Sequence, residues 1–311
     1  MALLKDNHID IPEDHSLVLA LSIASVVANS LPASPTSRVV GRTPPVPSAY
    51  PIGSACGNEW QYLNFDPSNN ADNGHLQTLH DIICSGEMRA ISRWGAKAAS
   101  DANLVYKRYF PMSDDDDDFQ VHVNSVLMKI AGQSSTEGMI GIIVGTFVVD
   151  NLGGTSTDFA GTCGEKETLA YTDTDHLDGR EKIHFCGIAW DRPNAQTRSG
   201  QCGDFDLFPS TKMDTFSRVA LHEMMHYSSV GPPSTLGEQI QDVFNVDRKV
   251  AYDPPRVHGL VDKNQDNNPA LTEINADSYA WMALDTWVSM TCSNDQATYD
   301  QFFEQNPPAY D

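Results

Sequence analysis

Residues 219–230 read VALHEMMHYSSV, and this stretch decides how the rest of the chain is interpreted. In a helix, positions i and i+4 lie on one face, so His222 and His226 can bind one zinc ion through their imidazoles. Glu223 projects beside them, where it can take a proton from a zinc-bound water. Two surface histidines flanking a glutamate would give the same letters, but burying these groups on an apolar helix without a metal is costly. The stretch therefore predicts a zinc site on a helix.

The helix that carries this stretch is expected to run from Thr215 to Ser228. Asp214 or Thr215 can cap its start, and the Gly-Pro-Pro sequence at residues 231–233 can end it. Apolar residues recur at helical spacing in other segments as well. These further predicted helices cover residues 75–99, which Gly86 is expected to divide, and residues 121–130 and 271–290.

β-branched residues are dense in residues 139–149 (MIGIIVGTFVV), which predicts a buried strand. Shorter strands are expected at residues 168–172 and 182–188. The chain should thus form helices, then a small sheet, then two helices that hold the site. This order predicts the α+β class, mostly helical with a small sheet, in one main domain with the His-Glu-x-x-His motif on the active-site helix.

A catalytic zinc needs a third protein ligand, and the sequence offers several carboxylates after the motif. Glu273 and Asp277 would share a face if residues 273–277 (EINAD) were helical. In thermolysin-like and neprilysin-like enzymes, an E-x-x-x-D helix supplies a glutamate ligand and an aspartate that orients one histidine. Both residues are therefore candidates for the site.

A second resemblance covers more of the chain. The run NADSYAWMA at residues 275–283 resembles the NADxYxxFA helix of the fungal deuterolysins and lysine-specific metallo-endopeptidases, the aspzincins. Residues 182–190 (KIHFCGIAW) and 107–110 (KRYF) are similar to upstream segments of that family. The similarity is collinear over about residues 75–290. It implies a zincin-like fold and a secreted zinc endopeptidase acting on proteins or peptides.

The chain departs from this family after the second histidine. Aspzincins take their third ligand from the aspartate of a GTxDxxYG motif, and no such motif follows His226. The resemblance implies Asp242 as the third zinc ligand and Tyr252 as the group that steadies the oxyanion. Asp277 would then hydrogen-bond a zinc histidine. Glu273 and Asp277 remain alternatives as the ligand.

The N-terminal region has the composition of exported proteins. The apolar stretch at residues 17–28 has the length of a signal-peptide core and is too short to span a bilayer, although Lys5 is outnumbered by neighbouring acids. An amphipathic helix is the alternative there. The expected parts are a signal peptide (1–31), a Pro/Ser-rich linker or propeptide (32–55), a zincin-like catalytic domain (56–292) and a C-terminal tail (293–311).

The cysteines and the net charge indicate the cellular compartment and the kinds of partner to expect. Six cysteines without a C-x-x-C pair fit three disulfides in an oxidising compartment, or six buried thiols in the cytosol. The formal net charge of -22 repels phosphate backbones and anionic lipids, so neither nucleic acid nor membrane is an expected partner. We expect a secreted monomer.

Two functions of different classes remain. The first is a secreted endopeptidase that uses zinc-activated water with Glu223 as general base. The alternative is a weakly active or inactive protein of the same fold that binds zinc or a host protein. The missing GTxDxxYG motif favours the alternative, whereas a tail without His or Cys (residues 293–311) weakens a zinc-scavenging role.

Overall fold

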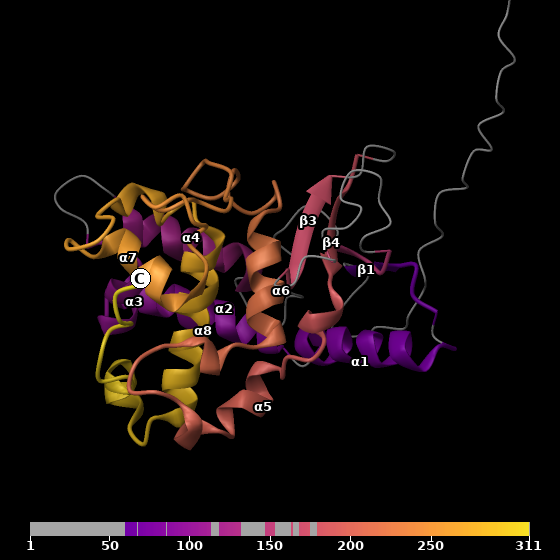
Figure 1. Cartoon of the computed structure of the whole chain (residues 1–311), viewed down its shortest axis with the longest axis horizontal. Helices are drawn as coiled ribbons and strands as arrows, with labels where there is room; N and C mark the ends of the chain where they lie inside the picture. The colour runs from indigo at the N-terminus through magenta and orange to yellow at the C-terminus, as the bar shows by residue number, and fades with distance from the viewer. Residues whose placement is uncertain are drawn as a thin grey trace, which may run out of the picture. The chain divides into compact units, whose positions relative to one another are not determined.

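The protein is described from a computed structural model (Figure 1). The structure describes residues 60–66, 68–84, 86–112, 118–131, 147–152, 163, 168–174 and 179–310. The predicted signal peptide and linker lie outside these residues, as do residues 139–146 of the predicted strand. Among the described residues, no helix is both long and apolar enough to cross a membrane.

About half of the described chain is helical. Gly86 has a φ of 80°, a left-handed conformation that glycine adopts readily, and it divides the first long helical segment as predicted. The helices are α1 (Asn70–Cys84), α2 (Glu87–Asp101), α3 (Leu104–Tyr109), α4 (Phe119–Ala131), α5 (Ala195–Ser199), α6 (Phe216–Met225), α7 (Asp253–Val261) and α8 (Ala276–Cys292).

Four short strands form one mixed sheet in the order β1-β2-β4-β3. The strands are β1 (Trp60–Leu63), β2 (Phe147–Asp150), β3 (Ala170–Thr174) and β4 (Glu181–Phe185). β2 pairs in parallel with both β1 and β4, whereas β3 pairs antiparallel with β4. The mixture of helices and one small sheet agrees with the predicted α+β class, although helices cover about half of the described residues and not most of them. β3 is the edge strand beside α6 (Figure 1).

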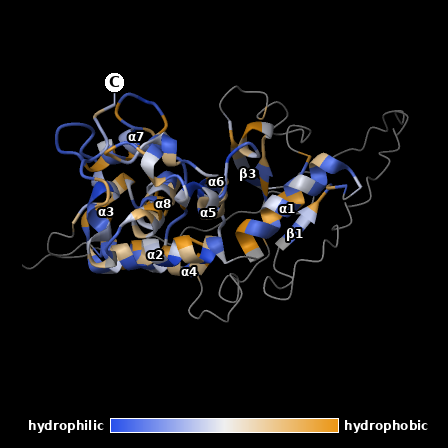
Figure 2. Ribbon diagram, turned by 90° about the horizontal axis from the view of Figure 1, so that it is seen from below, coloured by the Kyte–Doolittle hydropathy of each residue, from blue (hydrophilic) through white to orange (hydrophobic). Residues whose placement is uncertain are grey.

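The core lies between the helices α2, α4, α6 and α8. α2 and α4 run side by side in Figure 2, and each shows both apolar and polar residues along its length. Gly95 on α2 lets α8 approach closely, because a Cβ there would lie 3.0 Å from the Cβ of Ala283. The motif helix α6 is buried along all of its residues by this packing.

The segment expected to be a C-terminal tail packs on the helical domain. Residues Gln296–Gln301 form a 3-10 helix, and Phe303 is only 2% exposed. Arg108 on α3 donates a hydrogen bond to the backbone carbonyl of Phe303. The described domain therefore continues beyond residue 292.

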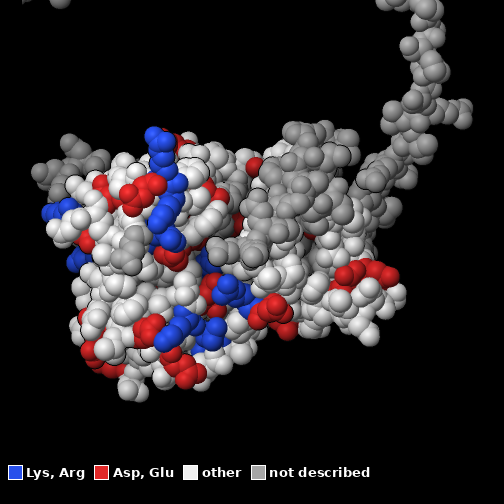
Figure 3. All heavy atoms as spheres, in the orientation of Figure 1, with Lys and Arg blue, Asp and Glu red and all other residues white. Residues whose placement is uncertain are grey.

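Two disulfides link described residues. One joins Cys163 to Cys186, and the other joins Cys202 to Cys292 at the end of α8. Cys56 lies outside the described residues, so the predicted third pair remains a prediction. Figure 3 shows Asp and Glu side chains at several separate places on one face, with Lys and Arg side chains beside them.

Candidate metal centre

The helix α6 places both motif histidines at the edge of the core. Its start is capped by Thr215, whose side chain accepts a hydrogen bond from the backbone N–H of Arg218 at 3.1 Å. It ends at Met225, with His226 as the C-cap residue, three residues before the predicted end at Ser228. The side chain of His222 is 7% exposed, and that of His226 is 17% exposed.

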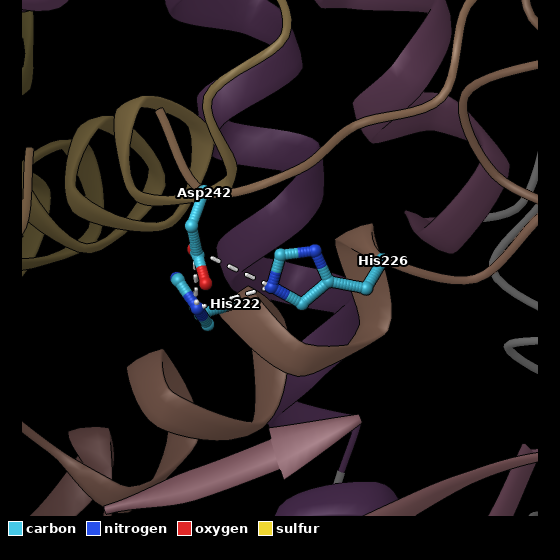
Figure 4. A group of neighbouring side chains, drawn as sticks. All are labelled: His222, His226 and Asp242. Atoms are coloured by element: carbon cyan, nitrogen blue, oxygen red, sulfur yellow. Dashed lines mark hydrogen bonds and ion pairs between the residues drawn. The ribbon is translucent and has the colours of Figure 1, made fainter. Parts of the chain in front are cut away.

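Asp242 completes a triangle of possible ligand atoms with the two histidines (Figure 4). The Nε2 atoms of His222 and His226 lie 3.3 Å apart. Asp242 Oδ1 lies 3.3 Å from Nε2 of His222 and 3.5 Å from Nε2 of His226. The three side chains come from α6 and from the segment that follows it, and all point toward one another.

The dimensions of this triangle fit zinc. A tetrahedral zinc ion with Zn–N and Zn–O bonds of about 2.0–2.1 Å needs ligand atoms about 3.3 Å apart. Asp242 Oδ1 is buried without a hydrogen-bond partner, although it faces two imidazole nitrogens. Burial raises the pKa of Asp242, but His222, His226 and Tyr252 outweigh it and hold that pKa well below its usual range. The donor set is thus one half-buried carboxylate and two imidazoles, which matches the ligand chemistry of a catalytic zinc site.

The other ring nitrogens of the histidines already have partners. Nδ1 of His222 lies 2.7 Å from Asp277 Oδ1, and Nδ1 of His226 lies 3.3 Å from the backbone oxygen of Ile240. Acceptors on Nδ1 favour the tautomer that leaves Nε2 free to bind a metal. Both rings are therefore oriented for ligation by Nε2.

Asp277 is held in place by a buried network that the sequence did not predict. Its Oδ1 accepts a hydrogen bond from Arg218 Nη1 at 3.0 Å, and its Oδ2 accepts from Trp281 Nε1 and from the backbone N–H of Asp253, each at 3.2 Å. Arg218 also pairs with Asp214 at 2.8 and 3.1 Å. Arg218 lies one helical turn before His222 and therefore on the same face of α6. Its position in the sequence could have indicated a buried cation near the motif histidines.

Glu223 lies next to the triangle, and its carboxylate is anchored. Thr172 on the edge strand β3 donates its hydroxyl to Glu223 Oε2 at 2.8 Å. The other oxygen, Oε1, lies 4.0 Å from Nε2 of His222. Burial raises the pKa of Glu223, although both motif histidines and Thr172 oppose this. A buried carboxylate with a raised pKa is a competent proton acceptor. Thr172 itself was not predicted, because only the folding of β3 onto α6 brings it here.

Tyr252 also reaches the triangle. Its hydroxyl donates a hydrogen bond to Asp242 Oδ2 at 2.8 Å, and its ring packs edge-on to the ring of His222 at 5.7 Å. Burial and the charge of Asp242 raise the pKa of Tyr252, so the phenol stays protonated. It can therefore donate a hydrogen bond at this site at neutral pH.

Glu273 lies elsewhere, and the helix predicted to carry it begins later. α8 starts at Ala276, so Glu273 and Asp277 do not share a helical face, contrary to the prediction. The backbone just before α8 is extended and pairs with residue 241, which prevents the helical conformation there. Glu273 Oε2 lies 2.6 Å from Nδ1 of His122.

Comparisons with known proteins give limited information. No family model matches this chain, and no curated protein matches it. A solved structure titled as a zinc peptidase from Grifola frondosa aligns with 64% of this chain and 90% of its own, at 15% identity and a TM-score of 0.38. An alignment this loose does not establish a shared fold.

Proposed function

We propose that this chain is a zinc-dependent endopeptidase in which His222, His226 and Asp242 hold the metal. The observation that carries the proposal is the triangle of two imidazole nitrogens and one carboxylate oxygen, 3.3–3.5 Å apart. Glu223 on α6 lies beside it, so a proton acceptor is next to the metal-ligand set. A structural zinc site would normally have four protein ligands, whereas three ligands leave a position open for water.

The residues of the chain have distinct roles in this proposal. Bound zinc would supply a water molecule of lowered pKa and would polarise the scissile carbonyl. Glu223 accepts the proton of the attacking water and passes it to the leaving amine, so that the peptide bond is hydrolysed without net proton change. Thr172 fixes one oxygen of Glu223 by its hydrogen bond and thereby directs the other oxygen.

Tyr252 and Asp277 have supporting roles in this chemistry. The hydroxyl of Tyr252 can donate to the oxyanion that forms when the carbonyl is attacked. Asp277 holds the ring of His222 through Nδ1 and increases its basicity toward a metal. Asp277 is therefore assigned to positioning, in place of the alternative role as a ligand.

The setting of the enzyme is part of the same proposal. Two disulfides among the described residues are compatible with an oxidising compartment. We assign the chain to the extracellular space, with residues 1–31 as signal peptide and residues 32–55 as linker or propeptide. The substrates are proteins or peptides, and the enzyme acts as a monomer of zincin-like fold.

Zinc content and casein hydrolysis test the proposal together, on the full chain and on Glu223→Ala. We expect one zinc per chain in both proteins, with hydrolysis reduced at least about 100-fold in the variant, because general-base catalysis contributes that much. Zinc in both proteins without hydrolysis in either would favour the zinc-binding alternative. Absence of zinc from both would refute the metal site.

A further inference from the structure

The segment between Asp242 and Tyr252 is a β-hairpin that starts and ends at the candidate metal centre. We infer that its outer face is a substrate-binding strip that selects peptides with an apolar side chain close to the scissile bond. This inference rests on the proposed peptidase function and names the substrate class for that site. Phe244 and Val246 are the residues that would make the contact.

Backbone hydrogen bonds define the register of the hairpin. The N–H of Ala251 donates to the carbonyl of Val243 at 2.8 Å, and the N–H of Asn245 donates to the carbonyl of Lys249 at 2.9 Å. These two bonds flank the antiparallel bridge between residues 244 and 250. That bridge is therefore a non-hydrogen-bonded pair, in which the two side chains lie close together on one face.

One face of the hairpin is buried against the domain. Val243 is 5% exposed and Ala251 is 0% exposed, and both pack with Leu260, Leu271 and Ile274. The alternation of a strand then requires residues 242 and 244 to point the other way. The exposed fraction of Phe244, 60%, agrees with this, and Val246 in the turn that follows is 67% exposed.

The outer face is continuous with the metal centre. At the end of the hairpin away from its turn, the hydroxyl of Tyr252 donates to Oδ2 of Asp242 at 2.8 Å, so these two side chains lie together at the metal centre. Phe244 follows on the same face at the two-residue repeat of a strand, about 7 Å along. An extended peptide has the same repeat, so a substrate bound at the metal could place an apolar side chain against Phe244. Val246 lies in the turn that closes the hairpin, where the N–H of Arg248 donates to the carbonyl of Asn245.

The chemistry of this strip selects against charged side chains. Two large apolar residues that are both exposed on the hairpin favour an apolar partner, because burying their surface removes it from water. A peptide side chain of Leu or Phe would gain this burial, whereas a Lys or Glu side chain would have to give up hydration there. The expected substrate is thus an extended peptide with an apolar residue within a few positions of the cleaved bond.

A matched peptide series tests the inference. The peptides differ only at the positions flanking the scissile bond, which carry Leu, Ser, Lys or Glu. Each is measured for hydrolysis by the wild type and for equilibrium binding to Glu223→Ala, in which the metal ligands are retained. Phe244→Ser and Val246→Ser are combined in one variant. Leu207→Ser is the control, because Leu207 is 58% exposed and lies outside the hairpin.

We expect the wild type to prefer the Leu peptide. The double hairpin variant should lower kcat/KM for the Leu peptide about tenfold, mainly through KM, because lost apolar burial is lost uniform binding. The Ser peptide should change less than about twofold in that variant, and Leu207→Ser should change neither peptide. An equal loss of kcat/KM for the Leu and Ser peptides in the double hairpin variant would overturn the inference. A preference of the wild type for the Lys or Glu peptide would also overturn it.

Failure of the peptidase proposal would be visible separately. If the wild type cleaves no peptide, binding to Glu223→Ala still decides whether the strip recognises apolar side chains. The strip is supported without any hydrolysis if Glu223→Ala binds the Leu peptide more tightly than the Ser peptide and this difference disappears when the two hairpin substitutions are added. Equal binding of all four peptides would refute it.

Discussion

Asp242 and Glu273 are two of the three carboxylates, with Asp277, that the sequence left open as the third ligand, and their surroundings differ. Asp242 Oδ1 faces both Nε2 atoms, whereas Glu273 contacts His122. Asp242→Asn should therefore reduce zinc content to well below one per chain, because the neutral amide is a poor zinc ligand. Glu273→Gln should keep full zinc content and serves as the matched control. Zinc content by atomic emission checks both, and loss of zinc only in Glu273→Gln would contradict the assignment.

The pH dependence of zinc binding follows from the charge around His222. Burial lowers the pKa of His222, but Asp277 and Asp242 outweigh it and raise that pKa well above the usual value. The metal-free imidazole therefore holds a proton at neutral pH, and zinc must displace it. Zinc affinity should rise with pH up to this raised pKa. Calorimetric titrations in buffers of different ionisation enthalpy should show proton release, and binding without proton release at neutral pH would contradict this.

At the scale of elements, the sequence predicted the main helices but not every boundary. α6 begins at the expected cap, Thr215, yet ends at Met225 although apolar residues continue beyond it. Tyr227 is buried because its hydroxyl bonds the backbone of Val148, so its burial reflects a contact with β2. Periodicity cannot distinguish such burial from a further helical turn.

Local sequence patterns also predicted only part of the candidate site. His222, Glu223 and His226 could be placed together from local spacing, because one helix carries them. The hairpin that brings Asp242 to them could not, since it depends on pairing between residues 241 and 275, which are far apart in sequence. That pairing is also the reason why α8 begins only at Ala276, whereas the apolar periodicity predicted a helix from residue 271.

The two disulfides should stabilise the domain unequally. Cys202 and Cys292 are 90 residues apart, whereas Cys163 and Cys186 are 23 apart. In the chain-entropy model the longer loop contributes about 4–5 kcal/mol and the shorter about 3–4 kcal/mol. Replacing the Cys202 pair by serines should therefore lower the free energy of unfolding more than replacing the Cys163 pair. Urea unfolding measures both, and the reverse order would count against the entropic account.

At the scale of the whole molecule, bound zinc should stabilise the fold, because the ligand triangle exists only when α6 and the hairpin are packed together. Zinc at about 100 times its Kd would add about 2.7 kcal/mol. For a domain of this size that corresponds to a rise in Tm of about 5–10 °C, which a chelator should reverse. Differential scanning calorimetry tests this. The His222→Ala variant should show no zinc-dependent shift, and an equal shift in it would place the ion elsewhere.

The net charge of -22 belongs to the whole molecule, and we expect it to favour solubility and to disfavour anionic partners. It does not identify a substrate, whereas the proposed metal centre and the hairpin beside it would select one reaction and one class of peptide. Both proposals require a zinc ion bound between His222, His226 and Asp242.

Anomalous X-ray scattering at the zinc edge, from crystals grown with zinc, tests that position most directly. The account predicts one peak at the centre of the triangle, at about 2.0–2.1 Å from Nε2 of His222, Nε2 of His226 and a carboxylate oxygen of Asp242. Absence of a peak there, or a peak beside Glu273 and His122 instead, would contradict the central claim.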